Sequence, residues 1–353
     1  MQRFETITKA EQALNHMRRR ILTGELPGGS QVPPERTLCR EYALSRVTIN
    51  KITSSLVQEG LLERRGPRGT YVVGQNGRGA TLKIGFLMQT MQPQEVNPVL
   101  EAIFRAFVQA SHAHPVLVSF GMAGRWGERL PASFTATELD ALVVAGSAHP
   151  ELINSFRQRN RPLLFVDETD AADPEHCVTT DQTEAGRLGA KHLLECGRRR
   201  IVAFTYPKGS YRGFDLRLEG FRRAHAEAGV EPDERRILRP WFSRAEHIVE
   251  ILRKMEQDAG SFDAFYGFAD LIALWGMDAL LRMGKRVPEE VAVLGIDGLP
   301  LGEWSRPALS SVGQPVEQLG TRAFERIHHW LQSGRDEAGL ERLAPVLLLR
   351  SST

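Results

Sequence analysis

The hydrophobic pattern changes character near residue 80. Before that point, apolar residues recur at the spacing of an α-helix, as at Leu14, Met17 and Ile21, and turn-rich segments separate the periodic stretches. After it, short continuous apolar runs alternate with amphipathic stretches, which is typical of parallel strands covered by helices. The sequence therefore predicts a small, mostly helical N-terminal domain followed by a large α/β domain.

The N-terminal domain is predicted to hold three helices. The first ends in the turn-rich loop Gly24–Gly29, and the second begins at Pro33-Pro34, since proline is tolerated in a first helical turn. Ser45 can cap the third helix, Arg46 to about Glu59, by accepting hydrogen bonds from its free N–H groups. We expect the third helix to bury its apolar side chains, which are Val47, Ile52, Leu56 and Val57.

Polar and cationic residues occupy the first half of the third helix and suit the major groove of DNA. The groove admits one helix, and side chains near the start of that helix reach base edges. The residues in question are Arg46, Thr48, Asn50 and Lys51, preceded by Ser45. A hairpin is predicted next, with strands at Leu61–Arg65 and Thr70–Val73 and a cationic tip that includes Arg68. We expect the tip to touch phosphates or the minor groove.

Five motifs of this domain occur at the spacing of a known DNA-binding module. They are ILTGELPGG, VPPER, LSRVTIN, LVQEGLLERR and RGTYVV. Together they resemble the winged helix-turn-helix of the GntR family of bacterial regulators. The resemblance implies DNA contacts at Arg36, Arg46, Thr48 and Gly69. Asn50 departs from it, because the family usually has arginine there; asparagine pairs bidentately with adenine and arginine with guanine, so we expect an altered operator. A small helical domain that binds protein is the alternative.

Charge is distributed unevenly along the chain. Residues 1–74 hold twelve Lys and Arg against seven Asp and Glu, a net charge of +5, and since the whole chain carries +2 the remainder carries −3. A cationic small domain on a mildly acidic large one is typical of a polyanion partner for the first alone. The three cysteines form no CxxC pair, and neither a membrane-spanning run nor a signal peptide is visible, so we expect a reducing, cytoplasmic setting.

From Leu82 onward the sequence predicts alternating strands and helices. The strands are expected at Leu82–Met88, Val116–Phe120, Ala141–Ala145, Leu163–Val166, Ile201–Thr205, Ala264–Gly267 and Val291–Gly295. The helices are expected at Pro98–Ser111, Glu151–Arg159, Glu184–Cys196, Leu216–Ala228, Ala245–Glu256 and Asp270–Met283. Ligands of parallel sheets collect beyond the carboxyl ends of the strands. The candidate residues at those ends are Gln89, Ser147, Asp167, Asp270 and Asp297.

Six blocks of this region point to a known ligand-binding fold. They are LDALVVAG, VTTDQTEAGRLGAKHLLECGRRRIVAF, RLEGF, RVPEEVAVLGIDGLP, RPALSSVGQPVEQLG and VLLLRSST. Together they resemble the sensor domain of the LacI family, itself similar to periplasmic sugar-binding proteins of type I. The resemblance implies two α/β lobes with a ligand cleft between them, lobe 1 at about 82–180 and 314–343 and lobe 2 at about 181–313 and 344–353.

The expected domain boundaries follow from the two resemblances. A winged helix-turn-helix DNA-binding domain is expected at residues 1–74, and a LacI-type ligand-binding and dimerisation domain at residues 82–353. The polar, Gly-rich residues 75–81 are predicted to form a flexible linker.

The LacI resemblance also implies ligand contacts. Arg217 and Asp297 match the most recurrent pair of the family, since an aspartate accepts hydrogen bonds from sugar hydroxyls while an arginine donates to others. The further candidates are Asn97, Asp167, Trp241, Phe242, Asp270 and Gln314. Two features depart from the family: Ala269 replaces its usual asparagine, and the stretch 121–138 is too short for the customary second helix.

Other interpretations compete with this sugar site. Arg217 could instead pair with a carboxylate inside one lobe. Lys208, Tyr211 and Arg212, near the expected cleft entrance, would also tolerate an acidic or phosphorylated ligand, although loop cations are usually just solvated. No His or Cys group has the spacing of a metal site, and no phosphate loop or nucleophile elbow follows a strand. We therefore predict no metal, no cofactor and no catalytic residue, and do not expect an enzyme.

Three functions compete for this sequence. A transport binding protein would have no use for residues 1–74, and a sugar-converting enzyme would need a catalytic group that the sequence does not offer. A sugar-responsive transcription factor, similar in arrangement to the arabinose repressors, uses every segment. We expect a cytoplasmic homodimer that represses transcription at a double-stranded DNA operator and is released by a small sugar-like effector. The alternatives are a ligand-activated activator, or a cytosolic sugar-binding protein or enzyme with a DNA-binding-like head.

Overall fold

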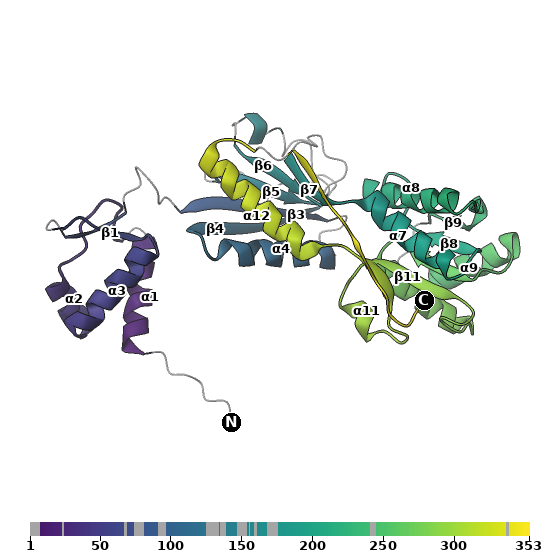
Figure 1. Cartoon of the computed structure of the whole chain (residues 1–353), viewed down its shortest axis with the longest axis horizontal. Coiled ribbons are helices and arrows are strands. Elements are labelled where there is room, and N and C mark those ends of the chain that lie inside the picture. The colour runs from purple at the N-terminus through teal and green to yellow at the C-terminus, as the bar shows by residue number, and fades with distance from the viewer. Residues whose placement is uncertain are drawn as a thin grey trace, which may run out of the picture. The chain divides into compact units, whose positions relative to one another are not determined.

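The chain divides into two units. The first comprises Met1–Leu82 and His114–Leu117, and the second comprises Lys83–Ala113 and Val118–Thr353. The computed structural model in Figure 1 describes residues 8–22, 25–66, 69–73, 81–90, 97–124, 134, 139–146, 154, 156–158, 161–167, 176–240, 245–336 and 339–353. Of residues 22, 89, 90, 123, 124 and 245 it describes the backbone alone. None of the described helices combines the length and the apolar character that crossing a membrane requires.

The first unit is a three-helix domain with a two-stranded hairpin. Its elements are α1 (Lys9–Leu22), α2 (Glu35–Tyr42), α3 (Arg46–Gln58), β1 (Leu62–Arg64) and β2 (Thr70–Val72). The two strands pair antiparallel, with Leu62 opposite Val72. Side chains from all three helices and both strands, among them Met17, Leu38 and Leu56, form one buried core. The predicted helix-turn-helix and its hairpin are thereby confirmed.

The third helix begins as predicted but turns a different face to the core. Ser45 Oγ accepts a hydrogen bond from the Thr48 N–H at 3.2 Å, which confirms the predicted N-cap. Val47, predicted to be buried, is 69% exposed. The buried face consists of Ile49, Ile52, Thr53 and Leu56. This set has the i, i+3, i+4, i+7 spacing of one helix face, and Val47 precedes it by two residues, on the opposite side, so that part of the prediction was wrong.

The second unit contains two six-stranded sheets, each the centre of a lobe. Their strand orders are β13-β7-β6-β5-β3-β4 in lobe 1 and β14-β12-β11-β10-β8-β9 in lobe 2. Lobe 1 consists of β3 (Leu82–Thr90), α4 (Pro98–Ser111), β4 (Val116–Gly124), β5 (Ala141–Ala145), β6 (Leu163–Val166), β7 (Cys177–Thr180), α12 (Val316–Ser333) and β13 (Leu340–Leu343). Lobe 2 consists of α7 (Gln182–Glu195), β8 (Ile201–Phe204), α8 (Arg212–Glu227), η3 (Glu234–Arg236), β9 (Ile237–Leu238), α9 (Ala245–Ala259), β10 (Ala264–Gly267), α10 (Asp270–Arg282), β11 (Ala292–Asp297), α11 (Leu301–Trp304), β12 (Ser310–Gly313) and β14 (Val346–Leu348). The described pairings are parallel except that of β14 with β12.

Helices cover both faces of the lobe 2 sheet. In β8, Ile201 and Ala203 pack with α7 and α8, whereas Val202 and Phe204 pack with α9 and α10, because successive side chains of a strand point to opposite faces. In lobe 1, α4 and α12 lie against each other (Figure 1). The predicted two-lobed α/β fold with parallel sheets is confirmed.

The chain passes between the lobes three times. It leaves lobe 1 between β7 and α7, returns between β12 and α12, and leaves again between β13 and β14. These crossings place Gln182, the first residue of α7, and Gln314, which directly follows β12, at the junction of the lobes.

Each strand predicted from an apolar run is present, and the predicted ends of strands and helices differ from the observed ones by up to four residues. Most of the predicted helix Glu151–Arg159 and of the stretch 121–138 lies outside the described residues. The elements that the prediction missed are β7, β9, β12, β13, β14, η3, α11 and α12. β7 and β12 read CVTT and SSVG; they are entirely buried, but their hydroxyl-bearing residues interrupt the apolar run that marks a buried strand.

Candidate functional site

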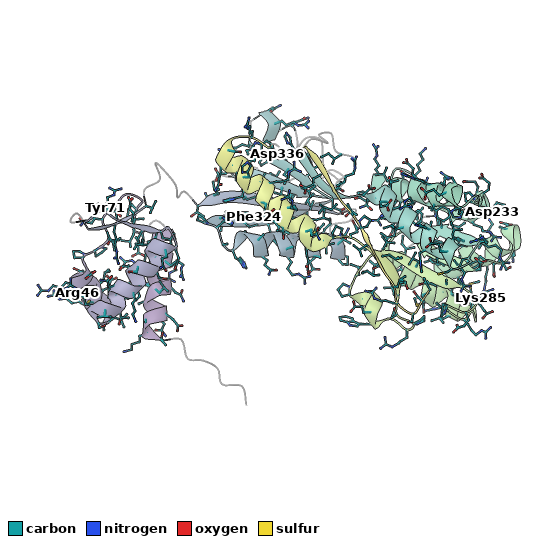
Figure 2. The ribbon with its side chains drawn as sticks, viewed as in Figure 1. Arg46, Tyr71, Asp233, Lys285, Phe324 and Asp336 are labelled. Atoms are coloured by element: carbon teal, nitrogen blue, oxygen red, sulfur yellow. The ribbon has the colours of Figure 1, made fainter. Side chains whose placement is uncertain are left out.

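The exposed start of α3 carries most of the predicted DNA-contacting side chains. Arg46 projects from the helix with 83% of its side chain exposed (Figure 2), and its Nε donates to Glu35 Oε2 at 2.8 Å. The hydroxyls of Ser45 and Thr48 share a hydrogen bond of 2.9 Å, and Lys51 is exposed. The surface around Arg46 is therefore cationic, polar and open to solvent.

Both the nitrogen and the oxygen of the Asn50 side-chain amide form hydrogen bonds within the domain. Its Nδ2 donates to Glu35 Oε1 at 3.2 Å, and its Oδ1 accepts from Arg64 Nη2 at 2.8 Å. Arg64 lies on β1 and also donates to Ser54 Oγ at 2.7 Å, which ties the hairpin to α3. Asn50 has to exchange these partners before it can pair with a base. The sequence did not single out Glu35 or Arg64 as site residues, although Glu35 directly precedes the candidate Arg36.

The remaining DNA candidates lie on α2 and at the hairpin. Arg36 is exposed on α2, and Arg68 lies outside the described residues. Gly69 adopts a φ of +100°, and a Cβ there would lie 2.6 Å from Gln31 Nε2. Glycine is therefore favoured at this end of the hairpin on steric grounds, independently of any contact with DNA.

In lobe 2, buried polar side chains meet at the carboxyl ends of parallel strands. Arg217 on α8 donates through Nη2 to Asp297 Oδ1 at 3.4 Å and through Nε to Gln182 Oε1 at 2.7 Å. Gln314 Nε2 donates to the same Asp297 oxygen at 2.8 Å, and Gln314 Oε1 accepts from Gln182 Nε2 at 3.0 Å. With Asp270 these residues form one network, the buried polar cluster, which consists of Gln182, Arg217, Asp270, Asp297 and Gln314. The sequence analysis named all of its members except Gln182.

Asp270, the first residue of α10, is committed to contacts within the protein. Its Oδ2 accepts from the Leu299 N–H at 2.6 Å and its Oδ1 from Ser311 Oγ at 2.5 Å. Its own N–H donates to Asp297 Oδ2 at 3.3 Å. Burial, together with the neighbouring Asp297 carboxylate, raises the pKa of Asp270 to about 7.

The members of the buried polar cluster differ in how much of each residue is exposed to solvent. Asp297 and Gln314 are 9% and 8% exposed, whereas Arg217, Gln182 and Asp270 are 3%, 1% and 0% exposed. Burial raises the pKa of Asp297, and the charge of Arg217 opposes that effect. Asp297 also holds a φ of 133°, which is strained for any residue but glycine. A molecule outside the cluster would therefore reach Asp297 and Gln314 first.

The other ligand candidates lie apart from this cluster. Asn97 Oδ1 accepts from two N–H groups in the first turn of α4, at 3.0 and 3.4 Å, and thus caps that helix. Asp167 follows β6, and its backbone oxygen accepts from the Tyr211 hydroxyl at 2.9 Å, a hydrogen bond between lobe 1 and lobe 2. Candidates that lie outside the described residues are Ser147, Trp241, Phe242 and the side chain of Gln89.

Comparison with known proteins identifies both units. Residues 9–72 match the model of the gntR family of bacterial regulatory proteins, and residues 190–353 match that of the periplasmic binding protein-like domain. The chain joins a GntR-type domain to a periplasmic-binding-protein-like domain. Both resemblances inferred from the sequence motifs are thereby confirmed.

Curated regulators and a solved structure are similar to this chain over different shares of its length. The arabinose metabolism transcriptional repressor of Geobacillus stearothermophilus is 22% identical over 99% of this chain and 98% of that protein. The HTH-type transcriptional regulator CelR of Thermobifida fusca is 35% identical over 58% of this chain and 60% of that protein. The solved structure of a CelR–cellobiose complex shares the fold of this chain, with a TM-score of 0.69 at 21% identity over 99% of this chain and 100% of that one.

The match to curated regulators is partial in length for several relatives. The chain spans 56–65% of the length of three of them, CelR included.

Proposed function

We propose that this chain is a DNA-binding transcription regulator, a repressor of sugar-catabolism genes that a small sugar-like effector releases. One observation carries the proposal: a GntR-type domain with an exposed cationic helix start is joined to a periplasmic-binding-protein-like domain with a buried Arg–Asp–Gln cluster. The first suits the major groove of DNA, and the second suits a polyhydroxylated molecule.

The proposed DNA contacts centre on Arg46. Its ion pair with Glu35 lies in water and is therefore weak, so the guanidinium can exchange that partner for a phosphate or a base at little cost. Val47, 69% exposed, adds an apolar surface that suits the methyl group of thymine. The full proposed set is Arg36, Ser45, Arg46, Thr48, Asn50, Lys51, Arg68 and Gly69.

The proposed effector contacts centre on Asp297 and Gln314, the two most exposed members of the buried polar cluster, with Arg217 behind them. Asp270 and Asn97 are proposed to position the site, since their side-chain oxygens are already engaged within the protein. Proposed contacts without a described role are Gln89, Asp167, Trp241 and Phe242. A sugar is the favoured class because two structures of the same fold hold sugars, the CelR–cellobiose complex and a LacI family regulator from Enterococcus faecium with bound ribose.

We propose that the regulator acts as a cytoplasmic homodimer and is not an enzyme. A two-fold symmetric protein reads a near-palindromic operator, and the exposed apolar side chains of Trp304 and Leu301 on α11 offer a surface for a second copy. The effector changes operator affinity only if it binds one arrangement of the lobes more tightly than another. A change in the arrangement of the lobes would act on the hydrogen bond from Tyr211 to Asp167, because that bond joins lobe 2 to lobe 1.

The DNA part of the proposal is tested with duplex DNA from the promoter region of the gene itself. Arg46→Ala should weaken operator binding in a gel shift by about tenfold or more. Arg253→Ala, which removes an exposed arginine from α9 in lobe 2, is the matched control and should bind as the wild type does. Binding should fall steeply with salt because cationic contacts release counterions. A wild-type protein indifferent to this DNA at all salt concentrations would refute the proposal.

The effector part is tested by thermal shift with pentoses, hexoses and polyols. Asp297→Asn should abolish the stabilisation that the active sugar gives to the wild type, because it replaces one of the two acceptor oxygens by a nitrogen that donates and removes the negative charge. Asp278→Asn, on the exposed side of α10, is the control and should keep it. The same sugar added to the gel shift separates a repressor, whose DNA affinity it lowers, from an activator, whose affinity it raises.

A further inference from the structure

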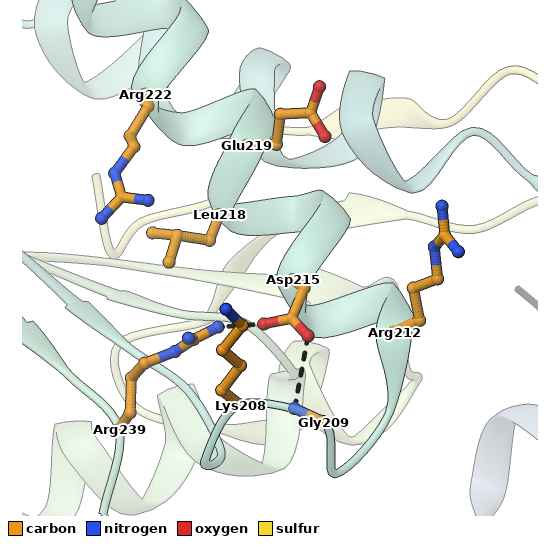
Figure 3. A pocket seen from close by; sticks show the side chains of 8 residues that line it. All are labelled: Lys208, Gly209, Arg212, Asp215, Leu218, Glu219, Arg222 and Arg239. Carbon is orange, nitrogen blue, oxygen red and sulfur yellow. Dashed lines mark hydrogen bonds and ion pairs between the residues drawn. The ribbon is translucent and has the colours of Figure 1, made fainter. Parts of the chain in front are cut away.

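A cavity lies on lobe 2 at the start of α8, with a volume of about 680 Å³. Its lining is rich in charge, with four basic and two acidic side chains (Figure 3). These are Lys208, Arg212, Arg222, Arg239, Asp215 and Glu219. The volume lies within the range of about 300–1,000 Å³ that small-molecule sites occupy.

Only half of the basic side chains are neutralised nearby. Asp215 accepts from Arg239 Nη2 and also from the Gly209 N–H, at 3.3 Å. Arg222 pairs with Glu234 at 2.8 Å. Within the part of the chain that the structure describes, Lys208 and Arg212 form no ion pair. In Figure 3 the Glu219 carboxylate and the Arg212 guanidinium both point away from Lys208 and Arg239. Four basic side chains against two acidic ones leave the lining with an excess of positive charge.

Arg239 adds an independent sign of an incomplete site. Its side chain is only 23% exposed, and its Nε–H is buried with no hydrogen-bond acceptor among the described residues. A buried donor without an acceptor costs free energy, and an anion next to the guanidinium would recover part of that cost. The N-terminus of α8, whose cap residue Tyr211 gives no side-chain hydrogen bond to the helix, favours negative charge at the same place.

The cavity is separate from the buried polar cluster. None of the cluster residues lines it, although Arg217 of the cluster and Leu218 of the cavity are neighbours on α8. The two sites therefore share a helix and differ in character, since one is buried and holds a single arginine while the other is open and holds several basic residues.

We propose that this cavity binds a small phosphorylated molecule, as a second ligand site beyond the sugar site. At neutral pH a phosphate monoester carries about 1.5 to 2 negative charges, which suits the excess of positive charge in this lining. Arginine recognises phosphate through paired N–H groups, and lysine acts as a point charge. Because Tyr211, next to Arg212, donates to the lobe 1 residue Asp167, a phosphate here would act beside a contact between the lobes.

The test uses the full chain and isothermal titration calorimetry with D-glucose 6-phosphate, inorganic phosphate and D-glucose as probes. The double variant Lys208→Gln/Arg212→Gln should weaken binding of the sugar phosphate by about tenfold or more, a change in free energy of about 1.4 kcal/mol. The control Lys191→Gln/Arg223→Gln removes the same charge from exposed positions of α7 and α8 outside the cavity and should bind within about twofold of the wild type. Binding of inorganic phosphate alone would assign the site to the free ion.

Three outcomes would overturn the proposal. The first is that the Lys208/Arg212 double variant binds the phosphorylated probe as tightly as the wild type. The second is that the wild type binds neither phosphate-bearing probe. The third is that Asp297→Asn abolishes phosphate binding, which would place the phosphate at the buried polar cluster. If Asp297→Asn retains phosphate binding but no sugar stabilises the wild type, the second site stands and the proposed sugar site fails.

Discussion

The start of α3 and the buried polar cluster are built from the same three kinds of side chain in opposite surroundings. In the first, Arg46, Glu35 and Asn50 form a chain of hydrogen bonds in which the arginine is 83% exposed. In the second, Arg217, Asp297 and Gln314 form a similar chain in which no member is more than 9% exposed. Water replaces any lost partner in the first set, whereas the second set has to be satisfied by the protein or by a ligand.

This difference fits the two proposed roles. A DNA-reading surface exchanges its internal partners for phosphates and bases each time it binds, so weak contacts in water are suitable. A sugar site has to reject molecules that lack the right hydroxyls, and buried polar groups left unpaired provide that penalty. The comparison predicts that substitutions in the buried polar cluster change the free energy of unfolding strongly and that substitutions at the surface of α3 change it little.

The largest effect is expected from Arg217→Met. The variant leaves the Asp297 carboxylate buried without its arginine, which should lower the free energy of unfolding by about 3–5 kcal/mol. Arg223→Met on the same helix removes an arginine that is 65% exposed and should cost less than about 1 kcal/mol. Urea unfolding at neutral pH measures both. If the two variants lost similar amounts of unfolding free energy, the distinction between buried and exposed arginines would not hold.

The cluster also shows what the sequence could predict about a site. Asp297 stands at the end of a strand, where ligands of parallel sheets bind, so residue type and position named it. Arg217 and Gln314 were named by the resemblance of the RLEGF and VGQPV blocks to the LacI family. Gln182 was missed because it begins a helix after β7, a buried strand whose CVTT sequence gives no apolar run. Its role depends on the crossing that brings α7 and β12 together, and this crossing is a property of the fold.

At α3 the helix, its cap and its cationic residues could be predicted from the sequence, but the partners of these residues could not. Glu35 and Arg64 reach Asn50 from α2 and β1, across 15 and 14 residues of chain, and only the packed domain brings them together. Val47 was assigned to the wrong face because α3 has several apolar residues, and the packing of α1 and α2 decides which of them are buried.

A second effect of burial is a pH dependence of stability. The pKa of Asp270, about 7 in the folded chain, is about 3.9 for a carboxyl in an unfolded one. Between these values the folded state binds more protons, so its stability falls as pH rises from about 4 to about 7 and stays level above. Asp270→Asn cannot titrate and should gain stability relative to the wild type over this range, by up to about 1.4 kcal/mol per pH unit.

Urea unfolding of the wild type and of Asp270→Asn at about pH 5, 6, 7 and 8 measures this gain. The difference between their free energies of unfolding should change with pH. Any constant loss from the missing carboxylate cancels in that comparison. Asp278→Asn, on the same helix but exposed, is the control, and its free energy of unfolding should change with pH as that of the wild type does. If the free energy of unfolding of Asp270→Asn also followed the wild type at every pH, the buried acid would not titrate in this range.

At the exposed set the effect should fall on DNA recognition instead of stability. Asn50→Arg introduces the residue that the GntR family usually has at this position, and it should shift the preference at the contacted base pair from adenine towards guanine. A bidentate contact is worth about 1–3 kcal/mol of discrimination. Competition gel shifts with operator variants measure the change, and Gln58→Arg, which adds the same charge at the exposed C-terminal end of α3, is the control. Unchanged base preference would show that residue 50 does not read the operator.

The smallest effect is expected from Glu35→Gln. The change removes the ion pair with Arg46 and weakens one hydrogen bond of Asn50, but both contacts lie in water, so the free energy of unfolding should change by less than about 1 kcal/mol. The same substitution removes a negative charge beside the proposed DNA-reading surface and should therefore raise affinity for non-specific duplex DNA and reduce discrimination among operator variants. Glu59→Gln, whose partner Arg18 lies on α1, is the matched control. If Glu35→Gln destabilised the domain as much as Arg217→Met destabilises lobe 2, the α3 surface would be a structural cluster, and its proposed role in reading DNA would lose its physical basis.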